Sequence, residues 1–166
     1  MDEVNDDDLE ESLEEATADV PPDRAERFYD RIRTSIHRYV EKRGTAIEKT
    51  AEYLLLVPDF FILLWRLVND GRVNAKNKVL LGSGVAYFIF PLDLLPEAFL
   101  GPLGYVDDLV LSVFILNKIL RDTDVEIIRQ HWSGSEDVLA TIQKVLNAAD
   151  SLVGSDIVKK IKRIVK

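Results

Sequence analysis

Apolar residues recur at helical spacing along most of the chain. Between Ala25 and Val40 they stand mostly three or four positions apart, which predicts an amphipathic helix that ends at Gly44. Comparable patterns, separated by Pro, Gly and capping residues, continue to the end of the chain, and no sustained strand-like alternation interrupts them. The expected fold class is therefore all-α, a compact helical bundle. The predicted helices span residues 23–43, 45–57, 60–70, 74–90, 108–120, 124–132, 135–152 and 156–166.

Two helix starts are suggested by capping signals. Pro58-Asp59 should end one helix and cap the next, because proline removes a backbone donor and aspartate is a favoured N-cap residue. Ser133 and Glu136 have the spacing of a capping box for the helix at 135–152. Residues 92–107 contain too many Pro and Gly residues for one regular element, so an irregular connection is expected there.

Three segments, at residues 53–65, 79–92 and 109–116, are apolar on nearly all sides. The last two predict a strongly apolar central helical hairpin, and the excess of apolar surface favours contact with lipid. The uncharged stretch 79–92 covers roughly 21 Å, however, which is less than the hydrocarbon core of about 30 Å. A transmembrane or re-entrant hairpin, a surface attachment and a soluble bundle all remain as alternatives, and membrane association is the preferred one.

Charge divides the chain into a tail and a body. Residues 1–23 hold 11 of the 29 acidic residues and no Lys or Arg, so the remaining chain has 21 basic against 18 acidic residues. A segment this acidic buries too little apolar surface to offset its ordering entropy. Residues 1–22 are therefore expected to be a disordered acidic tail, and residues 23–166 a single α-helical domain. The acidic start is the reverse of a secretory signal, so a cytoplasmic N-terminus is expected.

The chain has few residues that could act as sulfur or imidazole ligands, which limits the metal sites and catalytic groups that it can form. The chain has no cysteine, which excludes disulfides, thiolate zinc sites, cysteine-ligated iron–sulfur clusters and cysteine nucleophiles. Its two histidines lie far apart in the sequence. His37 is expected on the surface, and His131, beside Trp132 and Ser133, is interpreted as part of a capping turn and not of a catalytic triad.

The helix expected at residues 156–166 is basic and amphipathic. Five Lys and Arg residues mostly occupy one face, which is typical of a helix that lies on an anionic membrane surface. A helix docked on the bundle by its apolar face is an equal alternative. No stacking aromatic residues interleave with the basic ones, so no nucleic-acid partner is expected. The apolar face consists of Ile157, Val158, Ile161, Ile164 and Val165.

Four carboxylates fall within 16 residues that carry no other charge: Asp93, Glu97, Asp107 and Asp108. The first interpretation is structural, with Asp93 and Asp107 as helix caps, Asp108 as a partner of the helix dipole, and Glu97 exposed. A site for a hard cation such as Mg²⁺ or Ca²⁺ is the second hypothesis. A carboxylate pair for hydrolysis is a weaker alternative. Ion pairs are the last alternative, with Arg66, Arg72, Lys76 or Lys78 as partners.

The order of residues around these acids forms a recognisable motif. The chain has Tyr87, Pro91, Asp93, Pro96, Gly104, Asp107 and Asp108 in sequence. This resembles the YkvA-like family, whose pattern is a tyrosine, P-x-D-x-x-P-D, a short Gly-containing loop and G-x-x-D-D; Glu97 stands where the family usually has Asp. The resemblance covers about residues 54–120. It implies an α-helical, often membrane-predicted domain without an established activity, which also occurs beside a RING finger in some membrane-bound ubiquitin ligases.

The sequence therefore predicts a small membrane-associated helical protein that acts on the cytoplasmic side as a structural or interaction module. Its expected partners are an anionic lipid surface and other proteins. The alternative from another class is a divalent-cation-dependent enzyme, with Mg²⁺ or Ca²⁺ bound by Asp93, Glu97, Asp107 and Asp108.

Overall fold

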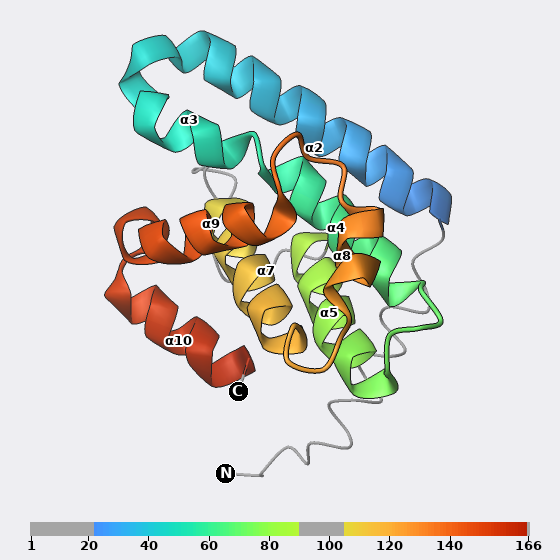
Figure 1. The fold of residues 1–166 in the computed structure, drawn as a ribbon. Coiled ribbons are helices and arrows are strands. Elements are labelled where there is room, and N and C mark those ends of the chain that lie inside the picture. The colour runs from blue at the N-terminus through green and yellow to red at the C-terminus, as the bar shows by residue number, and fades with distance from the viewer. Residues whose placement is uncertain (1–21, 90–104, 166) are drawn as a thin grey trace, which may run out of the picture.

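The computed structural model describes residues 22–89 and 105–165, and every regular element within these ranges is helical (Figure 1). The predicted all-α fold is thus confirmed. Except for Pro22, the predicted acidic tail lies outside the described residues. The helices are α2 (Pro22–Arg43), the 3₁₀ helix η1 (Gly44–Ile47), α3 (Glu48–Leu54), α4 (Val57–Val68), α5 (Ala75–Ile89), α7 (Tyr105–Ile119), α8 (Val125–His131), α9 (Val138–Val153) and α10 (Ser155–Val165).

Helices α4, α5 and α7 pack against one another and form the centre of the bundle. Helix α2 packs on α4, while α9 and α10 cover another side of α7 (Figure 1). The pair α5 and α7 corresponds to the predicted apolar hairpin. Its ends are also joined by polar contacts, because the buried Asn77 donates to Asp122 Oδ1 at 2.8 Å and to Thr123 Oγ1 at 3.0 Å.

Helix α7 is apolar nearly all round because other helices enclose it. It contacts α3, α4, α5, α9 and α10, and ten of its fifteen residues are buried. Helix α4 is also largely buried, between α2, α5, α7 and α8. Packing within the protein thus accounts for much of the apolar surface that favoured lipid contact.

A transmembrane helix, one of the alternatives that the sequence left open, is not found in the part of the chain that the structure describes. None of these helices is long and apolar enough to cross a bilayer. Helix α5, the best candidate from the sequence, has 15 residues and rises only about 22 Å.

Three helix starts differ from the sequence-based expectation. Helix α7 begins at Tyr105 and not at Asp108. Helix α4 begins at Val57, so Pro58 lies in its first turn, where a missing backbone N–H costs nothing, and Asp59 is not the cap. Helix α9 begins at Val138, and its N-cap is Asp137, whose side chain accepts a hydrogen bond from Ala140 N at 3.2 Å. The capping box predicted at Ser133 is therefore wrong. Gly44 follows α2 with a φ of 52°, in the left-handed region that favours glycine after a helix.

Gly84 allows three helices to approach closely. A Cβ atom at this position of α5 would lie 2.9 Å from Leu64 Cδ1 on α4 and 3.2 Å from Ile115 Cδ1 on α7. The absence of a side chain at Gly84 thus serves the packing of the protein's own core. Gly71, in the turn before α5, has open space around the same position.

Replacing Gly84 with Leu should destabilise the protein by about 3 kcal/mol, because an overfilled core must displace Leu64 and Ile115. Urea unfolding of the wild type and the variant measures this difference. Gly71→Leu is the control and should change the free energy of unfolding by less than about 0.5 kcal/mol. Equal stability of both variants would contradict the close packing of α5 against α4 and α7.

Candidate functional site

The first candidate site is the acidic motif, of which the structure describes two members. Asp107 and Asp108 lie in the first turn of α7, where the helix dipole favours negative charge. Neither is the cap residue, because α7 already begins at Tyr105. Asp107 is half-buried, and burial raises its pKa above the ordinary value of 3.8. Asp108 is 4% exposed, and its backbone oxygen accepts a hydrogen bond from Ser112 Oγ at 2.7 Å.

The other two members, Asp93 and Glu97, lie outside the described residues. Within the described ranges, no group of three or more His, Asp or Glu side chains is arranged to hold a metal ion. The hypothesis of a cation site built from all four carboxylates therefore remains a prediction.

A polar cluster that the sequence did not indicate joins the end of α4 to the end of α8. Asp70 Oδ2 lies 2.6 Å from His131 Nε2 and accepts a hydrogen bond from Arg72 at 2.7 Å. The Asp70 side chain is only 8% exposed. These two contacts, with Arg72 the stronger and His131 the second, hold the pKa of Asp70 well below its ordinary value of 3.8. Asp70 thus pairs with a residue 61 positions away in the sequence.

Arg66 fixes the backbone on the other side of this cluster. Its guanidinium donates to the carbonyl oxygen of His131 at 2.9 Å and to Ser133 Oγ at 2.5 Å. His131 and Ser133 are therefore held by Asp70 and Arg66 as parts of a structural clamp.

The Asp70 cluster should make stability depend on acid. Because the folded protein holds the pKa of Asp70 below 3.8, its pairing stabilises the fold above that pH and is lost as the pH falls toward the lower folded-state value. Asp70→Asn should accordingly be less stable than the wild type at pH 6, and this difference should shrink below pH 4. Thermal unfolding of both proteins from pH 7 to pH 2.5 measures it. A difference that is constant over this range would contradict the clamp.

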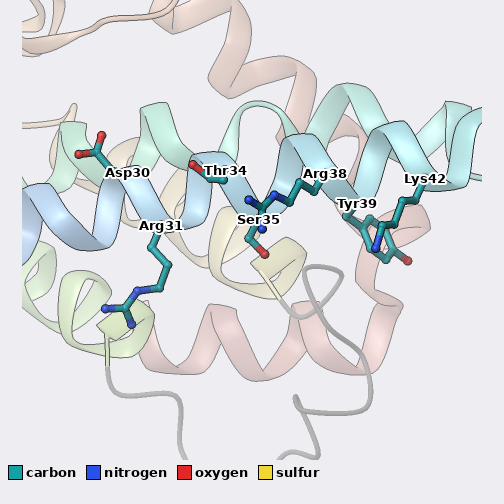
Figure 2. Close-up of a pocket in the computed structure, with 7 residues that line it drawn as sticks. All are labelled: Asp30, Arg31, Thr34, Ser35, Arg38, Tyr39 and Lys42. Carbon is teal, nitrogen blue, oxygen red and sulfur yellow. The ribbon is translucent and has the colours of Figure 1, made fainter.

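A shallow hollow of about 560 Å³ runs along α2 (Figure 2). Figure 2 shows Arg31, Tyr39 and Lys42 on the same side of this helix. The described residues that line it all belong to α2, and three of them are basic. They are Asp30, Arg31, Thr34, Ser35, Arg38, Tyr39 and Lys42.

Helix α10 has the apolar face and the basic face that its sequence predicts, and the structure shows what each of them contacts. Val158, Ile161 and Val165 are buried, and the helix packs on α7 and α9. Lys118 of α7 donates a hydrogen bond to the carbonyl oxygen of Val165. The structure therefore places most of the apolar face inside the bundle. The basic side chains stay exposed, and so does Ile164, at 63%.

Comparison with known proteins places the acidic motif in a described family. The model of DUF1232, a protein family of unknown function, matches residues 77–114, which form most of α5, the connection and most of α7. An uncharacterised protein, ORF9, of Methanothermobacter thermautotrophicus is 25% identical over 122 residues, 67% of this chain and 82% of its own length. No solved structure matches.

A second relative bears the name of the family that the acidic motif resembles. The uncharacterised membrane protein YkvA of Bacillus subtilis (strain 168) is 32% identical over 68 residues, which are 40% of this chain and 63% of that protein. The chain thus spans less than two thirds of this relative. Together with the family match at 77–114, this similarity confirms the predicted resemblance of this part of the chain to the YkvA-like family, whose function is unknown.

Proposed function

We propose that the protein attaches to an anionic membrane surface through α10 and serves there as a small interaction module. The observation that carries this proposal is the exposed side of α10. Lys159, Lys160, Lys162 and Arg163 are all exposed there, together with Ile164. One relative is described as a membrane protein, which supports an association of this chain with a membrane.

The charges of α10 are sufficient for such an attachment. Each Lys or Arg near an anionic leaflet contributes about 1 kcal/mol, so four of them supply about 4 kcal/mol before any apolar contact. Ile164 lies one helical turn after Lys160, so its side chain can enter the headgroup region between the basic ones. Since the anionic lipids of a cell face its cytoplasm, the proposed surface is the cytoplasmic one.

Flotation with lipid vesicles tests this function. The protein should float with vesicles that contain phosphatidylserine at 50 mM salt and should be released at 500 mM salt, because the attraction between exposed charges is screened. It should remain at the bottom of the gradient with vesicles of phosphatidylcholine alone. Equal flotation with both vesicle types, or none with either, would contradict an electrostatic attachment.

A second candidate function rests on the paired acids at the start of α7. Asp107 and Asp108 are partly or fully withdrawn from water, and a divalent cation would compensate their charge. If these residues hold a cation with Asp93 and Glu97, the metal should raise the stability of the native state by about 2.7 kcal/mol at a hundredfold its Kd.

Thermal unfolding with and without Mg²⁺, Ca²⁺ and Mn²⁺ tests the cation site. A metal-dependent rise in Tm that Asp93→Asn and Asp107→Asn both remove would support the site and the enzyme alternative. An unchanged Tm in the wild type would leave the acids with a structural role.

A further inference from the structure

A cleft of about 400 Å³ lies between α2 and the start of α4. Arg33 and His37, one helical turn apart, line its α2 side, and Asp59 lines its α4 side. Ile36 and Leu55 add apolar surface, and Leu55 is 40% exposed. This volume is typical of sites for small molecules, and the mixture of apolar lining with a few polar groups is typical of them as well.

Of the polar side chains that line this cleft, Ser133 accepts a hydrogen bond from Arg66, whereas the three charged or imidazole side chains are not used by the fold. The side chains of Arg33, His37 and Asp59 form no hydrogen bond or ion pair with another side chain or with the backbone in the described ranges. The other nearby cation, Arg66, is occupied by the backbone of His131 and the hydroxyl of Ser133.

The partial burial of the Asp59 carboxylate is unfavourable, and no contact within the described residues compensates it fully. Burial raises the pKa of its half-buried carboxyl group above the ordinary value of 3.8, and the charges of Arg33 and Arg66 only partly oppose this rise. The charge of Arg33 therefore acts on Asp59 without forming an ion pair with it, which leaves both groups available to a ligand. Unpaired groups of opposite charge in one cleft are a feature of binding sites.

We propose that the cleft binds a small zwitterion whose ammonium group contacts Asp59 and whose phosphate contacts Arg33 and His37. Two side chains that can donate hydrogen bonds, Arg33 and His37, face one carboxylate, which suits a phosphate with three acceptor oxygens better than a carboxylate with two. The planar guanidinium of Arg33 can donate two parallel hydrogen bonds to phosphate oxygens. Phosphoethanolamine is the simplest compound of this class. The proposal does not depend on membrane attachment, because α2 and α10 lie at opposite edges of the bundle (Figure 1).

Titration of ¹⁵N-labelled protein, followed by amide chemical shifts, tests this assignment. O-phosphoethanolamine should shift resonances of residues around the cleft and should bind at least tenfold tighter than ethanolamine, inorganic phosphate or β-alanine. Absence of binding at 10 mM, or equal binding of phosphate and phosphoethanolamine, would overturn the proposal.

Two substitutions separate the proposed contacts. Asp59→Asn should weaken phosphoethanolamine binding at least tenfold and leave the affinity for inorganic phosphate unchanged, whereas Arg33→Gln should weaken both. Asp59→Asn should be at least as stable as the wild type, because the substitution removes a partly buried charge. Asp30→Asn, an exposed residue of α2 outside this cleft, is the control and should bind like the wild type. Unchanged phosphoethanolamine binding by Asp59→Asn would overturn the proposal.

The same chemistry occurs in a soluble metabolite and in a lipid headgroup. Vesicles of phosphatidylcholine, with and without phosphatidylethanolamine, distinguish these sources for a protein that binds phosphoethanolamine. Stronger flotation with phosphatidylethanolamine that Asp59→Asn removes would assign the lipid, and equal flotation would assign the soluble compound.

Discussion

Replacing Ile161 with Asp should destabilise the protein by at least about 4 kcal/mol, because it places a charge where α10 packs on α7 and α9. Ile161 is 6% exposed. For a chain of this size, such a loss corresponds to a fall in Tm of about 10 °C. Ile164→Asp is the matched control on the same helix, and it should change the free energy of unfolding by less than about 0.5 kcal/mol.

Thermal and urea unfolding of the two variants measure this contrast. The contrast distinguishes an apolar face of α10 that docks on the bundle from one that inserts into lipid. If the face inserted into lipid, the protein in solution would tolerate Asp at both positions. Similar stability of Ile161→Asp and Ile164→Asp would therefore contradict the docking of α10 on the bundle. Point substitutions suit this purpose better than deletion of α10, which would remove part of the core.

Reversing three charges on α10 should reduce binding to anionic vesicles by more than a hundredfold. The variant Lys159→Glu, Lys160→Glu, Lys162→Glu loses about 3 kcal/mol of attraction and gains repulsion between the new carboxylates and the lipid. All three side chains are exposed, so the fold should be unchanged. Vesicle flotation measures the binding, and circular dichroism checks the fold.

The control for this variant carries the same change of charge on α2. Arg31→Glu, Arg38→Glu, Lys42→Glu alters the shallow hollow at the opposite edge of the bundle (Figure 1). It should weaken flotation by less than tenfold, because only the long-range attraction changes. If the α2 variant loses binding and the α10 variant keeps it, the membrane surface lies on α2 and the proposed orientation is wrong.

The sequence predicted the helices well because each of them has its own periodic pattern and its own breaks. The hairpin of α5 and α7 appears close to where the pattern placed it, whereas the single helix predicted at 45–57 is divided into η1 and α3 and ends at Leu54. The first residues of the helices were predicted less accurately, because the sequence does not distinguish a proline before a helix from one inside its first turn, as at Pro58.

Whether protein or lipid covers the apolar surfaces was harder to predict. A helix that is apolar all round has the same pattern whether lipid or protein surrounds it, and α7 is surrounded by protein. Likewise, the amphipathic pattern of α10 does not reveal which partner covers its apolar face.

Contacts between distant residues could not be predicted from local patterns. Asp70 and His131 are neighbours only because α4 and α8 pack together, and the cleft at Asp59 exists only because α2 lies beside α4. Of the acidic motif, the sequence correctly indicated that Asp107 and Asp108 lie at the start of a helix.

Fractionation of cells that produce the protein tests the membrane attachment most directly. The account predicts that the protein sediments with membranes at low salt and is released by 500 mM salt or by an alkaline carbonate wash, as expected for a surface contact made by exposed charges. Recovery of all the protein in the soluble fraction at low salt, or its retention in the membrane after carbonate, would contradict the account.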